Sequence, residues 1–400
     1  MNSTFYQTIV FLTLALVCFI TVYSDTSTTF YSTENDLQLE FRQDVIRNMT
    51  LEAWTAYQTY AWGARALRPV SREASHFLSP PGSGQTIIAA LSTLHVMGLQ
   101  KQFNVGKEWV EKKLNFTNIN FEMNVYDSIT EYIGGLLSVY ALTGDSLFLD
   151  KATQIGNIIK VAFNSSTGLL YRKIIPKTKG VPDNSQHTYL SFTGHQQPEL
   201  IFLTDHNNDT ELKTKLAQVR QFIAQIGVPK GHFTYLIDVS NGQRKNTTSA
   251  FGQNAKDFYY NLLRSYLQSA STDTQSLQTY MAALQSIVES SGLIRVTQNG
   301  HVLVTYWHRL LNISGKSMEA NTCYLGAMLS LGSGAMLKAT TLPVKNTFRV
   351  AAERSQQLAV NLTESCHMAA MATNSTLLPN EFAITDEGEV NVVDEQSYLT

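Results

Sequence analysis

The sequence predicts an all-α fold built from helical hairpins, and three observations support this prediction. From residue 40 onward, most stretches place apolar residues at i, i+3 and i+4, the spacing typical of amphipathic helices. Short breaks rich in Gly, Pro, Ser, Thr and Asp separate these stretches, as expected at helix ends. Strict alternation of apolar and polar residues is rare, so helices joined by short loops account for most of the chain.

The expected elements follow from this spacing in chain order. The predicted helices span residues 44–62, 84–99, 103–113, 124–142, 146–162, 209–227, 252–270, 273–291, 317–332 and 346–370. Residues 231–239 and 293–304 favour short β-hairpins instead. No low-complexity segment divides the chain, so one domain is expected from residue 40 to 400, after a linker at 25–39.

The composition limits the classes of function. The chain has 400 residues, of which 44% are hydrophobic and 16% charged, enough for a sizeable core and too few charges for a disordered polyelectrolyte. Lys and Arg total 30 and Asp and Glu total 32, so a nucleic-acid partner is not expected. The nine histidines form neither an H-E-x-x-H motif nor a zinc-ligand spacing, so no metal site is predicted from motifs.

The N-terminal segment is expected to direct the chain into the secretory pathway. Residues 9–23 are about fifteen apolar residues, short of the roughly 20 that a membrane span needs. Val22 and Ser24 are small enough for a cleavage site, so residues 1–24 are interpreted as a signal peptide. The alternative is an uncleaved signal anchor, because residues 2–8 carry no Lys or Arg. The expected location is the endoplasmic reticulum lumen, or a Golgi membrane if the anchor remains.

The cysteines and the glycosylation sequons agree with secretion. Cys18 lies in the signal segment, which leaves Cys323 and Cys366 to form one disulfide or to remain as two separate buried thiols. Eight asparagines begin an N-x-[ST] sequon, and each one that carries a glycan must lie at the surface. They are Asn48, Asn115, Asn164, Asn208, Asn246, Asn312, Asn361 and Asn374.

Several segments together resemble a known family. They are Tyr60-Ala61-Trp62-Gly63, Gly84-Gln85-Thr86-Ile87-Ile88, Gly134-Gly135-Leu136-Leu137-Ser138 and Leu142-Thr143-Gly144-Asp145. In these segments the chain resembles the class I α-1,2-mannosidases of glycoside hydrolase family 47, which trim high-mannose N-glycans by calcium-dependent inverting hydrolysis. The resemblance implies an (α/α)7 toroid, high-mannose N-glycans on glycoproteins as partners, Ca²⁺ as cofactor, and the Cys323–Cys366 pair as the family's disulfide.

The resemblance also implies which residues form the sugar site. Inverting glycosidases need one carboxyl group as acid and a second as base. Asp127 occupies the position of the general acid, one methylene shorter than the family's Glu. Lys256 stands where the family has an Asp, which leaves Asp257 as the candidate beside it. The substrate-binding positions matched by the chain are Gln197, Glu199 and Glu319.

Other positions implied to line the pocket differ from the family pattern. The family's acidic pair after the first motif corresponds to Arg65 and Ala66, and a family Arg corresponds to Glu131. The sequence ends at Thr400, where the family continues into a segment with another catalytic carboxylate and a calcium contact. The toroid is therefore expected to be incomplete and to supply no metal ligand. Poor turnover is expected, and the alternatives are an inactive glycan-binding factor in glycoprotein quality control or a truncated product.

Overall fold

The computed structural model describes residues 36–76, 82–116, 121–182, 186–194, 196–226, 235–245, 248–249, 251–252, 255–289, 292–308, 311–338, 345–374 and 376–393. The chain divides into two compact units, Met1–Thr55 and Ala56–Thr400. The described part of the first unit is the N-terminal part of helix α2 (Asp36–Tyr60). The expected signal peptide and Cys18 lie outside the described residues.

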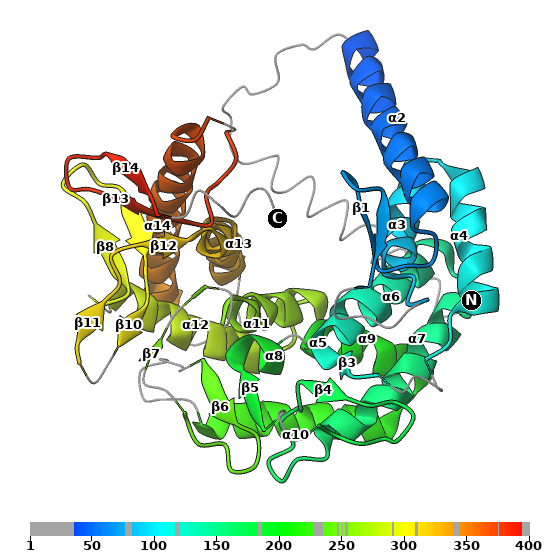
Figure 1. Cartoon of the computed structure of the whole chain (residues 1–400). Helices are drawn as coiled ribbons and strands as arrows, with labels where there is room; N and C mark the ends of the chain where they lie inside the picture. The colour runs from blue at the N-terminus through cyan, green and yellow to red at the C-terminus, as the bar shows by residue number, and fades with distance from the viewer. Residues whose placement is uncertain are drawn as a thin grey trace. The chain divides into compact units, whose positions relative to one another are not determined.

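Helical hairpins dominate the unit Ala56–Thr400 (Figure 1). The helices pack in consecutive pairs: α3 (Gln85–Val96) with α4 (Gln100–Lys113), α6 (Gly134–Thr143) with α7 (Ser146–Ile159), α9 (Gln196–Asn207) with α10 (Thr210–Ile226), α11 (Lys256–Gln268) with α12 (Thr274–Glu289), and α13 (Tyr324–Lys338) with α14 (Lys345–Met371). The first helix of each hairpin also contacts the first helix of the next. The prediction of helical hairpins is confirmed.

The turn between α6 and α7 shows how the sequence ends one helix and begins another. Gly144 has φ 70° and ends α6 in the left-handed conformation, with its N–H bonded to the Tyr140 carbonyl. Asp145 then caps α7, because its Oδ1 accepts from the Leu147 N–H at 3.1 Å. The motif residues Gly144 and Asp145 therefore set this hairpin.

Small residues let the helices approach closely. A Cβ on Gly135 of α6 would lie 2.8 Å from Cγ2 of Ile88 on α3, and one on Gly326 of α13 would overlap Thr363 on α14. The side chains around them are apolar and buried, including Ile88, Leu91 and Leu136. Glycines among leucines in these helices thus serve close packing rather than flexibility.

The strands are short and antiparallel. The hairpin predicted within 293–304 is confirmed by β8 (Ile294–Val296) and β9 (Val302–Val304). In the segment 231–239, β6 (Leu236–Asp238) pairs with β5 (His187–Tyr189) rather than with a neighbour in that segment, and 231–234 lie outside the described residues. The other strands are β1 (Ala66–Arg68), β2 (Glu73–Ser75), β3 (Met123–Asn124), β4 (Lys173–Ile174), β7 (Thr248–Ser249), β10 (Trp307–His308), β11 (Ile313–Ser314), β12 (Met318–Glu319), β13 (Glu381–Ile384) and β14 (Val390–Val392).

Three regions of the chain contain elements other than those predicted. Helices α8 (Leu190–Gly194) and α9 were not predicted, because Pro198 and the polar residues around it obscure the helical spacing. The predicted helix 124–142 consists of α5 (Val125–Asp127), a π-helix η1 (Ser128–Ile133) and α6. The predicted helix 317–332 begins instead with β12 and a 3₁₀ turn, η4 (Ala320–Cys323), because Met318 pairs with the distant Phe382.

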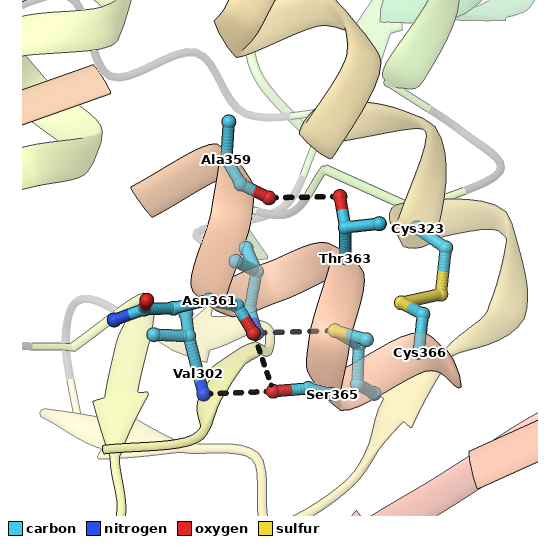
Figure 2. The surroundings of a disulfide bond; sticks show 9 residues. Val302, Cys323, Ala359, Asn361, Thr363, Ser365 and Cys366 are labelled. Carbon is cyan, nitrogen blue, oxygen red and sulfur yellow. Dashed lines mark hydrogen bonds between the residues drawn. A yellow bond between two sulfur atoms is a disulfide. The ribbon is translucent and has the colours of Figure 1, made fainter. Parts of the chain in front are cut away.

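A disulfide joins Cys323 of η4 to Cys366 of α14 (Figure 2). This confirms the predicted pair and excludes two separate thiols. Next to it, Ser365 Oγ accepts a hydrogen bond from the Val302 N–H at 2.9 Å, which ties strand β9 to the same helix. Of the helices in the described residues, none is long and apolar enough to cross a membrane.

Candidate active site

Asp127 lies in the first turn of α5, at the position implied for the general acid. Asn124 caps this helix, because its Oδ1 accepts from the Tyr126 N–H at 2.9 Å and the Asp127 N–H at 3.4 Å. Nη2 of Arg65 is 3.7 Å from Oδ2 of Asp127, and both side chains are partly buried. Burial raises the pKa of Asp127, and Arg65 opposes that rise by favouring the carboxylate.

Glu131 adds a second carboxyl group on the π-helix that follows. The Gly134 N–H bonds to the Ile129 carbonyl five residues back, which adds one residue to this turn. Oε2 of Glu131 is buried without a hydrogen-bond partner among the described groups. Burial, with a contribution from the Asp127 charge and an opposing one from Arg65, raises the pKa of Glu131 to about 7. Glu131 therefore holds a proton over much of the range in which an ordinary Glu is ionised.

Lys256 and Asp257 begin helix α11, and their side chains have different partners. Tyr126 Oη donates to Oδ2 of Asp257 at 3.4 Å. Lys256 Nζ donates to Oδ1 of Asn321 on η4 at 3.2 Å. Burial raises the pKa of Tyr126, and the Asp257 charge adds to the rise, so this phenol stays protonated as a donor. Lys256 therefore contacts Asn321, whereas Asp257 contacts Tyr126.

Glu199 forms an ion pair with the same helix. Nη1 of Arg264 donates to Oε1 of Glu199 at 3.2 Å. The guanidinium also lies over the Tyr260 ring, 5.5 Å from its centroid. Glu199 packs against α6, where a Cβ on Gly134 would lie 3.3 Å from its Cγ. Oε2 of Glu199 is buried without a hydrogen-bond partner among the described groups.

The remaining two predicted binding residues differ in how they are placed. Glu319 lies on β12, is exposed, and rests against Gly252 just before α11, where a Cβ would overlap its Oε2. Gln197 lies in the first turn of α9, and its side chain is outside the described residues. Both stay predictions as sugar-binding residues.

Contacts between aromatic and charged side chains join these groups into one site. Tyr126 contacts Asp257, and the Tyr324 hydroxyl donates to the Lys256 carbonyl at 2.9 Å. The rings of Tyr260 and Tyr324 meet edge to face at 6.3 Å between centroids. Helices α5, α9, α11 and α13 each contribute a residue, and α11 contacts both α9 and α13.

Sequence reasoning missed Tyr126, Arg264 and the proton held by Glu131. Arg264 follows Asp257 by seven residues, two turns along one face of α11, and that spacing could have indicated it. The high pKa of Glu131 has no sequence signal, because its largest cause is burial, which only the packed structure sets.

A calcium site is a separate expectation from the resemblance. Among the described residues, no three His, Cys, Asp or Glu side chains gather closely enough to hold a metal ion. Calcium prefers six to eight oxygen ligands, several of them carboxylates. The described residues do not fit such a site, and we derive no step through calcium.

The sequon asparagines can be compared with the structure, except for Asn246, which lies outside the described residues. Those that are exposed are Asn48, Asn115, Asn164, Asn208, Asn312 and Asn374. Asn361 is half-buried in the middle of α14, and its Oδ1 accepts from Gln357 Nε2 at 2.9 Å. Exposure meets one requirement for glycosylation at the six sites, and occupancy stays a prediction.

Known proteins align with most of the length of this chain. The family model "Glycosyl hydrolase family 47" matches residues 49–399. A mannosyl-oligosaccharide alpha-1,2-mannosidase IA of Spodoptera frugiperda is 30% identical over 374 residues, which cover 91% of this chain and 53% of the relative. A mannosyl-oligosaccharide 1,2-alpha-mannosidase IB of Mus musculus is 27% identical over 365 residues, or 90% and 54%. The chain spans about half the length of these relatives.

A solved structure gives the fold. An alpha-1,2-mannosidase from Trichoderma reesei superposes with a TM-score of 0.75 at 18% identity, covering 86% of this chain and 71% of that one. The prediction of the (α/α)7 fold class is thereby confirmed. The family match extends from α2 through the last described strand, and it includes all the carboxyl groups described above. With its helical hairpins and its sequence both matching, this chain belongs to glycosyl hydrolase family 47.

Proposed function

We propose that this chain binds the terminal α-1,2-linked mannose of high-mannose N-glycans on glycoproteins in the secretory pathway, and hydrolyses that linkage far more slowly than its relatives. Family membership and the names of the relatives, mannosyl-oligosaccharide 1,2-alpha-mannosidases, support the substrate class. The carboxyl groups of Asp127, Asp257 and Glu199 support sugar binding, because carboxylates accept hydrogen bonds from sugar hydroxyls.

The observation that carries the proposal of slow turnover is the placement of Lys256. An inverting glycosidase needs a carboxylate that deprotonates a water molecule on the face of the sugar opposite the acid. The resemblance implies that Lys256 stands at the position of that carboxylate, and its ammonium group donates to Oδ1 of Asn321. An ammonium group donates hydrogen bonds and accepts none, so it holds a sugar hydroxyl but does not take a proton from water.

A second candidate function is inverting hydrolysis with Asp127 as acid and Asp257 as base. The observation that favours it is Tyr126, which donates to Asp257 and whose pKa is raised by burial first and then by the neighbouring carboxyl groups of Asp257, Asp127 and Glu131. In that reaction Asp127 protonates the leaving oxygen while Asp257 removes a proton from the attacking water. Asp257 has a short side chain. Because it directly follows Lys256, it lies about 100° around the helix axis from Lys256.

Two measurements on the full chain separate these functions. The first is release of free mannose from a high-mannose glycan with calcium present, and the second is binding of the same glycan. We expect binding without appreciable release, and binding that persists in Asp127→Asn. The control Asp150→Asn changes an exposed carboxyl group on α7. Calcium-dependent release at rates typical of the family would overturn the proposal, and loss of that release in Asp127→Asn and Asp257→Asn would establish the second candidate.

A further inference from the structure

A short β-hairpin at the surface carries one of the glycosylation sequons. Strand β10 pairs with β11 on one side and with β7 on the other (Figure 1). The Leu311 N–H donates to Nδ1 of His308 at 3.3 Å, which ties together the two ends of the β10–β11 connection. Asn312 follows with φ 51° and begins the sequon Asn312-Ile313-Ser314. Asn tolerates this left-handed conformation better than most residues, so the sequon asparagine lies in a defined turn.

The Asn312 amide has one orientation that suits its partner. Nε1 of Trp307 donates to Oδ1 of Asn312 at 3.3 Å. An indole N–H only donates, so the amide oxygen rather than the NH₂ group faces it. Nδ2, the atom that carries an N-linked sugar, is then the end of the amide turned away from the indole nitrogen. Asn312 is exposed, as a glycosylated asparagine must be.

The Trp307 indole is held in place beside this amide. A Cβ on Gly292 would lie 2.5 Å from Cδ1 and 2.6 Å from Nε1 of the indole, so the ring packs directly on the Gly292 backbone. Trp307 is half-buried, which leaves part of its surface in contact with solvent. A sugar bonded to Nδ2 of Asn312 starts close to this ring. An aromatic ring offers a flat apolar surface to the C–H groups of a sugar.

Three apolar or aromatic side chains near the sequon are exposed. Leu311 is 64% exposed, Ile313 51% and Tyr306 49%. Neighbouring exposed apolar side chains favour association between chains. A glycan is bulky and solubilising, so a sugar attached between Leu311 and Ile313 would oppose such association. The composition of this hairpin therefore favours an occupied Asn312.

We propose that Asn312 is N-glycosylated and that the first N-acetylglucosamine of its glycan packs on the Trp307 indole, which stabilises the β10–β11 hairpin. In the transfer, Nδ2 of Asn312 forms a bond to the anomeric carbon of the sugar. The bond from that carbon to a lipid-linked diphosphate breaks, and the amide loses one proton as the diphosphate leaves. This modification requires the entry into the secretory pathway that belongs to the proposed function, but neither glycan binding nor hydrolysis at Asp127.

The first test is mass spectrometry of the full chain secreted from cultured eukaryotic cells. We expect a glycan on Asn312 in most molecules. Asn208 is the matched control, because it is an exposed sequon asparagine with φ 57° and has no hydrogen bond from an aromatic side chain in the described part of the chain. Molecules that carry a glycan on Asn208 but none on Asn312 would overturn the proposal.

The second test measures whether the sugar stabilises the hairpin. Ser314→Ala removes the sequon and keeps the Asn312 amide beside Trp307. Thr210→Ala is the control, because Thr210 is also exposed and completes the sequon of Asn208. An endoglycosidase first trims each glycan to one N-acetylglucosamine, so that only the first sugar is compared. We expect hydrogen exchange in the peptide 306–315 to be about fivefold faster in Ser314→Ala and unchanged in Thr210→Ala.

The third test asks whether the indole carries this effect. Trp307→Leu removes the ring and keeps the sequon, so adding Ser314→Ala to Trp307→Leu should leave the exchange rate unchanged. A fivefold effect of Ser314→Ala in that background would show that the sugar does not act through the indole. If Trp307→Leu does not fold, NMR of the unaltered glycoprotein decides. We expect a nuclear Overhauser effect between the sugar and the indole protons, and its absence would refute the contact.

The outcomes separate this modification from the proposed function. If no sequon asparagine of the chain carries a glycan, the chain does not enter the secretory pathway, and both proposals are overturned. If other sequons carry glycans and Asn312 does not, only the modification is wrong. If Asn312 is modified and the protein binds no high-mannose glycan, the proposed function fails while the result at Asn312 stands.

Discussion

The guanidinium of Arg65 lies 3.7 Å from the carboxylate of Asp127, Nη2 to Oδ2, and also acts electrostatically on Glu131. The positive charge of Arg65 therefore acts on two carboxyl groups, those of Asp127 and Glu131, which lie about one helical turn apart. With Asp127 ionised and Glu131 protonated, the three groups carry no net charge. This arrangement explains how two acidic side chains remain partly buried on one short helical segment.

Arg65→Met is expected to raise the pKa of Asp127. The methionine removes the charge that favours the carboxylate and leaves burial to act unopposed. The measurement is a pH titration of the Asp127 carboxyl carbon by NMR, assigned with Asp127→Asn. Arg68→Met is the control, because Arg68 lies three residues further along, on β1, but is exposed and pairs with Glu73. An unchanged Asp127 titration in Arg65→Met would show that the ion pair has no electrostatic effect.

Glu131→Gln is expected to flatten the pH dependence of stability. Because the pKa of Glu131 is raised from its ordinary value of 4.5 to about 7, the folded state binds this proton more tightly than the unfolded state. The free energy of unfolding therefore falls as the pH rises from 4.5 to about 7, and stays low above that, by at most about 3 kcal/mol. Glutamine does not ionise, so the variant is more stable than the parent at pH 8.

Denaturant unfolding at a series of pH values measures this difference. The control is Glu111→Gln, an exposed glutamate on α4. Equal pH slopes for the parent and Glu131→Gln between pH 4.5 and 7 would contradict the raised pKa.

Gly252→Ala is expected to weaken glycan binding with little loss of stability. The new Cβ would overlap Oε2 of Glu319, and an exposed carboxylate can move away at a cost below about 1 kcal/mol. If Glu319 binds sugar, its displacement lowers the affinity about tenfold, equivalent to 1.4 kcal/mol. Gly334→Ala is the control, because a Cβ there meets nothing within 4 Å. The combination of Gly252→Ala with Glu319→Ala should bind no more weakly than Glu319→Ala alone.

Removal of the disulfide is expected to lower the free energy of unfolding by about 4 kcal/mol in the chain-entropy model. Cys323 and Cys366 are 43 residues apart, and opening this loop increases the freedom of the unfolded chain. The test compares thermal unfolding of the double variant Cys323→Ser, Cys366→Ser with that of the parent. A reductant should lower the melting temperature of the parent and leave that of the double variant unchanged. Equal melting temperatures without reductant would refute the prediction.

The sequence alone predicted the helical hairpins and many of their boundaries. Apolar spacing and punctuation such as Gly144-Asp145 act over a few residues, so they can be recognised without knowledge of the fold. The sequence also named Cys323 and Cys366 as the disulfide pair, with two separate thiols as the alternative, and the structure decided for the disulfide. The assignment of Asp127, Asp257, Glu199 and Glu319 to the site came from the resemblance to the family, because its motifs show which residues of separate segments correspond to the family's site residues.

Only the tertiary structure decided which of those side chains meet. The proton on Glu131 requires burial, which outweighs the opposing charge of Arg65, and the contact between Arg264 and Glu199 joins two helices far apart in the sequence. Strand β12 formed where helical spacing was present, because pairing with β13 outweighed local preference. These features depend on distance and dielectric between segments far apart in the chain, and such quantities do not exist until the segments pack.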